Sequence, residues 1–369
     1  MILSGVAISF TLGEEGIFKR AKEGAETYQN ASENEKVELD KVSNYIDNYL
    51  KENNEDKEEK SEVEEAIKNG TVYKENTTIY DKYSNPVKVP AGFKLAQDSG
   101  TDVTKGVVIE DVNAGDEISK ENQYVWIPIG DVKYNENGDI KTINFGRYEF
   151  ETNPAGVLRQ SADNYTEVVE IDIGHEYNYT EIINEANNIT AKNLGDFITK
   201  AKSSKGYYIG RFETGKVGEN TNTFNIKKEQ EVYNEITQAN AANLARNLYS
   251  SNSNFESDLI NSYAYDTAII FIQTFSGDEN YSKQIPLQSA LTTTGNSHDD
   301  NNNYDVRCNI YDMSGNVMEW STETYTDSST PCTKRGGYYN SSHDYTAHRT
   351  YYRTNYSNNT LGFRSIIYV

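Results

Sequence analysis

Two cysteines and four histidines are the side chains in this sequence with the widest reactive chemistry. Cys308 and Cys332 are too few for a disulfide-rich scaffold or for a zinc site built from four thiolates. The segment between them is short and rich in turn residues, so the pair indicates either one disulfide formed in an oxidising compartment or two unpaired thiols. His343 and His348 lie five residues apart in a predicted loop, a spacing that matches no standard metal-ligand pattern.

The segment 338–360 has a composition suited to binding rather than to catalysis. Six of its 23 residues are Tyr, four are Asn, four are Thr and three are Ser, and none is Lys, Ile, Leu, Val or Glu. Tyr offers a large contact area with few rotatable bonds, and the small polar side chains adapt their hydrogen bonds, as in antibody loops. The segment therefore predicts a ligand-binding surface. The alternative is an exposed polar loop of an Asn- and Tyr-rich protein.

The charge of the chain excludes one class of partner. Lys and Arg number 35 against 57 Asp and Glu, which gives a formal net charge of −22. So acidic a chain repels phosphate backbones and anionic lipid surfaces, and its Lys and Arg residues form no local basic run. We therefore expect no nucleic-acid partner, while the many carboxylates are suitable ligands for cations such as calcium.

The elements that position this segment begin near residue 71, where short apolar stretches alternate with Gly, Asn and Asp turns. The predicted strands are Val87–Leu95, Val107–Ile109, Tyr124–Ile129, Ile143–Glu151 and Tyr207–Phe212. The predicted helices are Ala191–Lys202, Gln238–Ser250 and Tyr265–Thr274. Residues 295–360 show almost no periodicity and read as long loops. The expected fold class is α+β with a high loop content.

The first 70 residues differ from the rest. Residues 1–12 are uncharged and mostly apolar, too few to span a bilayer as a helix, which needs about 20. They read as the second half of a hydrophobic helix, and residues 2–23 resemble the N-terminal helix of type IV pilin-like proteins of low-GC Gram-positive bacteria. We predict a pilin-like helix over 1–50 and an acidic linker over 51–70, with a domain boundary near residue 70. The alternative for 1–50 is an ordinary amphipathic helix.

Three C-terminal motifs carry a second resemblance. They are Asn-Ile-Tyr-Asp-Met-Ser-Gly-Asn-Val-Met-Glu-Trp at 309–320, Arg-Gly-Gly-Tyr-Tyr at 335–339 and Leu-Gly-Phe-Arg at 361–364. In this order they resemble the formylglycine-generating enzyme, or sulfatase-modifying factor, family. Segments beginning at Val89, Tyr124 and Gly206 fit early strands of bacterial members, so the resemblance covers roughly 86–369. It implies a C-type-lectin-type fold with sparse regular structure over residues 71–369.

The resemblance also implies a calcium ion. In the family, the loop that matches 312–319 binds calcium, so Asp312 and Glu319 are expected to supply side-chain oxygens and Gly315 and Val317 backbone carbonyls. This mixture of carboxylates and carbonyls suits a hard cation. The alternative is that Asp312 caps a turn, Glu319 pairs with an arginine and Trp320 belongs to the core.

The resemblance does not extend to the family's chemistry. Its oxidase activity needs two cysteines shortly after Arg-Gly-Gly, where they hold copper, and the matching positions here are Ser341 and Thr346. A hydroxyl group is a poor ligand for a soft metal. A related iron-dependent branch uses a histidine cluster, which the spacing of His343 and His348 does not supply. We therefore expect no copper and no enzymatic activity.

Between its Arg-Gly-Gly and Gly-Phe-Arg flanks, the segment 338–360 resembles the variable region of the target proteins of diversity-generating retroelements. This resemblance implies a diversified ligand-binding surface. The candidate binding residues are Tyr338, Tyr339, Asn340, His343, Asp344, Tyr345, His348, Tyr351, Tyr352, Asn355 and Tyr356.

The resulting hypothesis is a non-enzymatic, surface-displayed adhesin or receptor of a low-GC Gram-positive bacterium, located extracellularly or at the cell surface. Its ligand is an unidentified protein or carbohydrate, and its N-terminal helix anchors it to a pilus or a membrane. The alternative is a pilin-like structural subunit with a static lectin-like domain.

Overall fold

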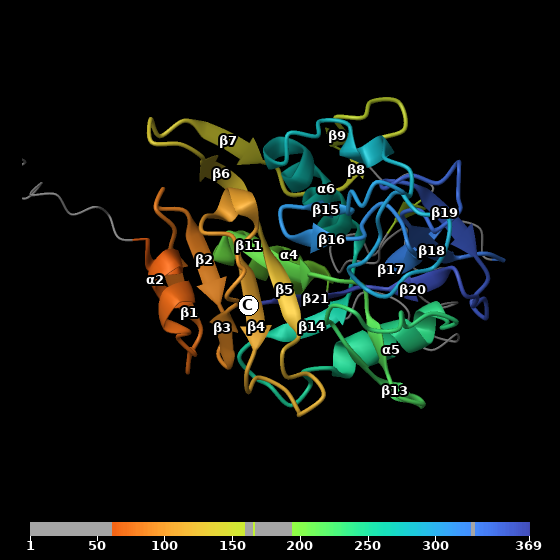
Figure 1. The fold of residues 1–369 in the computed structure, drawn as a ribbon, viewed down its shortest axis with the longest axis horizontal. Coiled ribbons are helices and arrows are strands. Elements are labelled where there is room, and N and C mark those ends of the chain that lie inside the picture. Colours follow the sequence, from red (N-terminus) through yellow and green to blue (C-terminus); the bar gives the residue numbers. More distant parts are fainter. Residues whose placement is uncertain (1–60, 159–164, 167–193, 326–328) are drawn as a thin grey trace, which may run out of the picture. The chain divides into compact units, whose positions relative to one another are not determined.

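The computed structural model describes residues 61–158, 165–166, 194–325 and 329–369 (Figure 1). These residues belong to one compact unit that begins at Lys60. It is an α+β structure with few helices and many strands. The predicted pilin-like helix over 1–50 lies outside the described residues, as does most of the predicted linker. Within the described part of the chain, no helix is long and apolar enough to cross a membrane.

The larger sheet has six strands, all antiparallel, in the order β14-β21-β11-β5-β4-β3. In chain order these strands are β3 (Phe93–Leu95), β4 (Val108–Asp111), β5 (Gln123–Pro128), β11 (Gly206–Gly210), β14 (Glu256–Leu259) and β21 (Ser365–Tyr368). The C-terminal strand β21 therefore lies inside the sheet, between β11 and β14. This placement fixes the end of the chain, and with it the preceding segment, to the centre of the fold.

Each face of this sheet packs against a hydrophobic core, so both faces are buried. Successive side chains along one strand point alternately into the two cores. Trp126 of β5 and Tyr208 of β11 enter one core, which also contains the alanines of α5 (Gln238–Asn247). Ile127 of β5 enters the other core, with the apolar face of α6 (Ser262–Phe275) and part of α4 (Leu194–Ser204). Burial on both faces explains why β5 and β11 are almost continuously apolar in sequence.

The smaller sheet brings the three C-terminal motifs together. Its order is β10-β17-β18-β19, and β20 also pairs with β17 in parallel. The strands are β10 (Tyr165–Thr166), β17 (Met318–Tyr325), β18 (Cys332–Arg335), β19 (Arg349–Tyr352) and β20 (Leu361–Phe363). Glu319 lies opposite Arg335 on one side and Gly362 on the other. Glu319 is therefore a direct neighbour of residues that lie 16 and 43 positions further along the chain.

Small elements complete the domain. Five two-stranded sheets are formed by β1 (Thr77–Tyr80) with β2 (Pro86–Val89), β6 (Gly130–Lys133) with β7 (Ile140–Ile143), β8 (Tyr148–Glu149) with β9 (Val157–Leu158), β12 (Gly215–Val217) with β13 (Asn220–Asn225), and β15 (Val306–Arg307) with β16 (Ile310–Tyr311). Short 3₁₀ helices occupy η1 (Val103–Lys105) and η3 (Tyr281–Lys283).

The three predicted helices are present with shifted ends, and two of them begin at a capping side chain. Asn261 accepts a hydrogen bond from the Ala264 amide at the start of α6, and Thr237 accepts one from the Asn240 amide at the start of α5. Such caps satisfy amides that have no partner inside the helix. The extra turn of α6 before Tyr265 therefore follows from its cap.

Four predicted features need correction. The segment Val87–Leu95 forms two strands, because Gly92 has φ +90° and turns the chain between them. Ile143–Glu151 is likewise divided between β7 and β8. Residues 62–69, assigned to the linker, form helix α2 (Glu62–Asn69), which buries Val63 and Ala66 in the domain. The segment 295–360, which was predicted to form loops, contains β15 to β19. The sequence of these strands shows no alternation of apolar and polar residues, because many of their buried residues are polar.

Candidate ligand-binding surface

Two buried carboxylates hold three arginines beneath the segment 338–360. Nη2 of Arg335, on β18, lies 2.6 Å from Oδ1 of Asp266, and its Nη1 lies 3.3 Å from Oε2 of Glu323. Arg349, on β19, also pairs with both carboxylates, and Arg147 lies 2.9 Å from Glu323. Because Arg335 and Arg349 are direct cross-strand neighbours, they would repel each other without the acids.

The charges of this network act on Glu323 itself. Burial alone would raise the pKa of Glu323, but the positive charges of Arg349, Arg335 and Arg147 lower it to about 2. The carboxylate is therefore ionised at any physiological pH. It lies on β17, so one side chain ties the central strand of the smaller sheet to β18 and β19. The network is thus a framework that fixes β18, after which the segment 338–360 begins, and β19, which lies within that segment.

The two glycines of Arg-Gly-Gly belong to the same framework. Gly336 has φ +80°, and a Cβ there would lie 2.9 Å from the Tyr265 hydroxyl oxygen. A Cβ on Gly337 would lie 2.6 Å from Cγ of Pro286. The Tyr265 hydroxyl in turn lies 3.0 Å from the Thr346 carbonyl oxygen, to which it donates. Side chains are thus excluded where the segment leaves β18, and a buried tyrosine fixes its middle.

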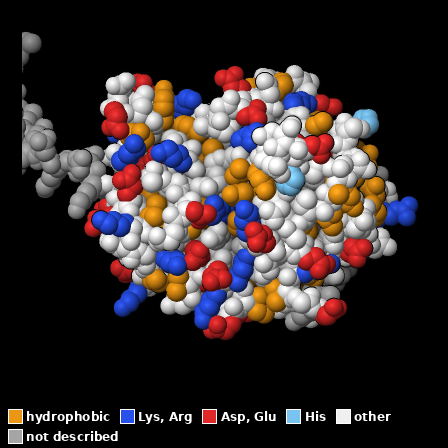
Figure 2. All heavy atoms as spheres, viewed as in Figure 1, with side chains coloured by type: hydrophobic (Ala, Val, Ile, Leu, Met, Phe, Trp, Pro, Cys, Tyr) orange, Lys and Arg blue, Asp and Glu red, His pale blue; other side chains and the backbone are white. Residues whose placement is uncertain are grey.

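The structure places none of the eleven candidate binding side chains in the core. Asn340, His343, Tyr351 and Asn355 are exposed, and Tyr338, Tyr339, Asp344, Tyr345, His348, Tyr352 and Tyr356 are half-buried. By contrast, Thr346 and Ala347 are buried and anchor the segment. In Figure 2, orange side chains, a class that includes tyrosine, are visible over β18 and β19, and charges of both signs are interspersed on this face of the molecule.

Stacked tyrosines order part of this surface. The rings of Tyr352 and Tyr356 are stacked with centroids 3.8 Å apart, and Tyr351 stacks at 3.8 Å on Tyr325 of β17. Stacking fixes the ring orientations before any ligand arrives, which lowers the entropy lost on binding. The sequence did not identify Tyr325, because only strand pairing brings it to Tyr351.

A buried lysine lies beneath the tyrosines. Lys334 of β18 is 6% exposed, and its Nζ lies 4.6 Å from the centroid of the Tyr352 ring. Burial lowers the pKa of Lys334 to about 8, although the negative charge of Asp344 acts in the opposite direction. The cation therefore faces an aromatic ring and an acid of the same segment. No sequence signal marks Lys334, since a lysine beside Arg335 reads as exposed.

A second part of the surface surrounds Asp344. Its Oδ1 lies 2.6 Å from Nδ1 of His348, and its Oδ2 accepts a hydrogen bond from the Ser341 hydroxyl at 2.7 Å. His343 instead has its Nδ1 2.8 Å from the Ser342 hydroxyl oxygen. The two histidines of the segment therefore serve different partners. Tyr345 packs against the core that contains α6, whereas Tyr338, Tyr352 and Tyr356 pack against the other core.

The predicted calcium ligands lie in a buried acidic cluster. Asp312 accepts backbone hydrogen bonds from Gly295 at 2.6 Å and Ser297 at 3.3 Å, and Oε1 of Glu319 lies 2.7 Å from Nη2 of Arg364. Oε2 of Glu319 is buried without a hydrogen-bond partner among the described residues. Burial, followed by the charge of Asp305, raises the pKa of Asp312 to about 7.

Glu213, which the sequence did not identify, completes this cluster. Its carboxylate accepts hydrogen bonds from Nδ2 of Asn316 at 2.7 Å and from the Val317 amide at 3.1 Å. Burial and the nearby charges of Asp312 and Glu319 raise its pKa. Oxygen ligands of this kind suit calcium. However, no three His, Cys, Asp or Glu side chains of the described residues converge as metal ligands, so the fit to calcium is one of ligand chemistry only.

Of the two alternatives for the cysteines, a disulfide or two unpaired thiols, the structure has the unpaired thiols. Cys308 and Cys332 are both free. Cys332 lies on β18, where it pairs with Tyr352, whereas Cys308 lies in the turn between β15 and β16, with its carbonyl close to Gly106. Placement in two different sheets keeps the sulfur atoms apart. Burial raises the pKa of each thiol to about 12.

Comparison with known proteins agrees with the sequence motifs. Residues 235–369 match the family model of the Sulfatase-modifying factor enzyme 1-like domain. The C-terminal part of this chain is therefore similar to that domain. Its boundaries enclose the Arg-Gly-Gly and Gly-Phe-Arg motifs, α5, α6 and the whole smaller sheet apart from β10, so the predicted resemblance is confirmed over this range.

Solved structures give weaker likenesses. A protein described as CarF has 14% sequence identity and a TM-score of 0.32, covering 67% of this chain and 98% of its own. Treponema denticola variable protein 1 has 15% identity and a TM-score of 0.26, and the match covers 69% of this chain and 98% of that protein. Scores this low assign neither a site nor a function. No curated protein sequence matches the chain.

Proposed function

We propose that this protein is a non-enzymatic ligand-binding protein, built on a C-type-lectin-type domain, whose binding face is the Tyr- and Asn-rich surface of residues 338–360. The observation that supports the proposal is the contrast between the buried ends of this segment and the accessible side chains between them. Its ends are held by buried Arg335, Gly336 and Arg364, while all eleven candidate side chains remain at least partly accessible. A rigid frame that carries accessible, interchangeable side chains suits recognition by contact area.

The absence of oxidase chemistry is part of the proposal. Where the family places two reactive cysteines, Ser341 donates to Asp344 and Thr346 donates to the Gln284 carbonyl. The two thiols that the chain does contain lie elsewhere and have raised pKa values, which disfavours the thiolates that soft metals bind.

A diversity-generating retroelement is the proposed source of variation at this surface. The test is the nucleotide sequence across residues 335–364 and the adjoining genomic region. We expect a near-identical repeat that differs at adenines, next to a reverse transcriptase gene. If no such repeat is found, the surface is static, and the pilin-like structural subunit becomes the leading hypothesis.

The binding surface itself is open to a direct test. A display library randomised at the eleven candidate positions should yield clones that bind hen lysozyme and still resist thermolysin like the parent protein, because none of these side chains belongs to the buried ion-pair network. A matched library randomised at the eleven exposed or half-buried positions of β1, β2, β6 and β7 should yield no such binders. Loss of protease resistance in most clones of the first library would show that the segment is structural.

Display at the cell surface, through the pilin-like residues 1–50, is a further part of this proposal. It rests on the sequence resemblance of residues 2–23 alone. Fusion of residues 1–70 to a fluorescent protein in a Gram-positive host should send the fusion protein to the cell envelope, and deletion of residues 1–30 should release it.

Calcium binding at Asp312, Gly315, Val317 and Glu319 remains our prediction. If the acidic cluster binds calcium, 1 mM CaCl₂ should raise the melting temperature by several degrees, since a ligand at about 100 times its Kd stabilises by roughly 2.7 kcal/mol. MgCl₂ at the same concentration is the control, because Mg²⁺ sheds its water less readily. Equal melting temperatures with CaCl₂ and with EDTA would contradict a calcium site.

A further inference from the structure

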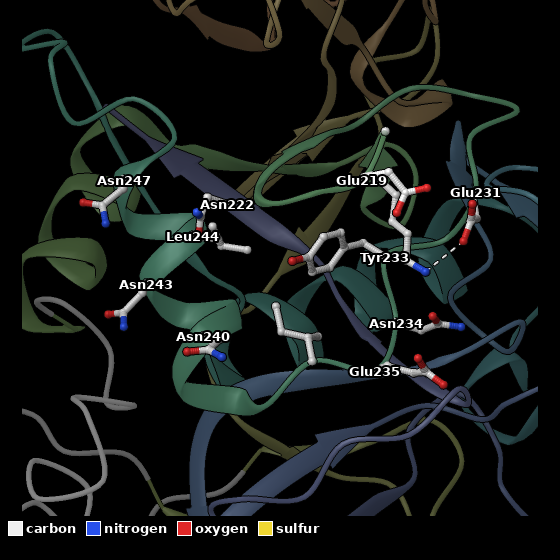
Figure 3. A pocket seen from close by; sticks show the side chains of 13 residues that line it. Glu219, Asn222, Glu231, Tyr233, Asn234, Glu235, Asn240, Asn243, Leu244 and Asn247 are labelled. Atoms are coloured by element: carbon white, nitrogen blue, oxygen red, sulfur yellow. Dashed lines mark hydrogen bonds and ion pairs between the residues drawn. The ribbon is translucent and has the colours of Figure 1, made fainter.

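A polar groove lies outside the tyrosine surface. It has a volume of about 770 Å³ and runs between helix α5, the hairpin β12–β13 and the loop 231–236 (Figure 3). Neither the C-terminal motifs nor the candidate binding residues contribute to its lining. The groove therefore needs an explanation of its own.

One wall of the groove is a row of asparagines on α5. Asn240, Asn243 and Asn247 are spaced by three and four residues, so they lie on one face of the helix, and all three are exposed. Asparagine is a weak helix former, because its side chain competes for backbone hydrogen bonds. The opposite face of α5 consists largely of buried alanines. Helix stability thus favours other residues at the exposed positions, which points to a role in binding.

The rest of the lining supplies further hydrogen-bonding groups around a small apolar centre. Asn222 and Asn234 add two more amides, and Figure 3 shows the ring of Tyr233 between α5 and the hairpin, facing Leu244. The carboxylate of Glu231 is paired with Lys216 at 2.8 Å.

We propose that this groove binds an uncharged oligosaccharide. Each sugar hydroxyl both donates and accepts a hydrogen bond, and an asparagine amide offers both functions in one side chain. Tyr233 is 6% exposed and packs against Phe363, so the half-buried Leu244 presents most of the apolar contact that the C–H face of a sugar ring needs. Glu219 and Glu235 also line the groove, and together with a net charge of −22 they disfavour anionic ligands. Four exposed amides, those of Asn222, Asn240, Asn243 and Asn247, outnumber the three lining carboxylates, which favours a neutral sugar over a basic peptide.

The groove adjoins the tyrosine surface without sharing its side chains. Nδ2 of Asn234 donates to the Asn359 carbonyl at 2.9 Å, and the Glu235 amide donates to the Asn358 carbonyl at 2.9 Å. The groove is thus fixed to the end of the segment 338–360. Its proposed ligand does not depend on the proposed function, because no candidate residue of that surface is needed to bind it.

The experiment starts with the full chain on an array of immobilised neutral, sialylated and sulfated oligosaccharides, together with a lysine-rich peptide. We expect retention on neutral oligosaccharides. The double variant N243A/N247A should then weaken the affinity for the best neutral oligosaccharide by at least tenfold, since one hydrogen bond contributes up to about tenfold. Its melting temperature should be unchanged or higher, because alanine favours the helix. Loss of binding therefore cannot come from misfolding.

Two matched variants complete the test. N301A removes an exposed side-chain amide that does not line the groove, and Y351S alters the tyrosine surface, so both should bind the oligosaccharide as the parent does. Failure of every neutral oligosaccharide to bind would overturn the proposal, as would unchanged affinity in N243A/N247A. Preferential binding of the lysine-rich peptide would replace the ligand class with a basic peptide. None of these results tests ligand binding by the tyrosine surface.

Discussion

Replacing Glu323 with glutamine is expected to destabilise the domain by roughly 3–5 kcal/mol, the usual cost of removing one partner from a buried ion pair. The substitution keeps the shape of the side chain and removes its charge. Arg335 and Arg349 would then share the carboxylate of Asp266, and Arg147 would lose its ion pair with Glu323. Because Arg335 and Arg349 are cross-strand neighbours, the variant places like charges in a buried space.

Urea unfolding at pH 7 of wild type and E323Q measures this effect. The matched control is E117Q, which removes an exposed carboxylate paired with Lys120 and should change stability by less than about 1 kcal/mol. If E323Q cost as little as E117Q, the arginine network would not be the framework of the segment.

The pH dependence adds an independent check. The pKa of Glu323 is lowered from its ordinary 4.5 to about 2 in the folded state. Its charge therefore stabilises the fold above about pH 4.5, and this contribution is lost as the pH falls towards 2. The stability difference between wild type and E323Q should shrink over that range. A constant difference would mean that the lost stability comes from packing.

Replacing Arg364 with methionine should have an effect of similar size. Arg364 donates to Glu319 through Nε at 2.8 Å, to the Gly210 carbonyl through Nη1 at 2.8 Å and to the Tyr311 carbonyl through Nη2 at 2.9 Å. It joins β11 of the larger sheet to β17 of the smaller one. Without it, the buried acids Glu319 and Glu213 lose their nearest cation, which we expect to cost roughly 3–5 kcal/mol.

Thermal unfolding of R364M is the measurement, with R353M as the control. Arg353 lies in the same C-terminal segment but is exposed, so its loss should leave the melting temperature within a few degrees of wild type. Hydrogen exchange should show opening of β20 and β21 in R364M first, since these strands flank the missing side chain. Equal melting temperatures for the two variants would contradict a joining role for Arg364.

Features that depend on local spacing could be predicted from the amino-acid sequence alone. The motifs at 309–320, 335–337 and 361–364 predicted the sulfatase-modifying-factor-like domain, because each encodes a local constraint. Gly336 and Gly337 leave no room for a Cβ, and Trp320 is fully buried. The composition of 338–360 likewise predicted a surface segment, since its polar side chains cannot form a core.

Contacts between residues far apart in the sequence became clear only from the folded structure. Glu213, Lys334 and Tyr325 join their sites through strand pairing and close packing, and the asparagines of α5 meet Tyr233 across a groove. Free Cys308 and Cys332 follow from their placement in separate sheets. The strands within 295–360 were missed because their buried positions hold Ser, Thr, Glu and Arg, whose burial depends on partners far along the chain. The periodicity of apolar residues in a sequence cannot reveal a core that is stabilised by buried ion pairs.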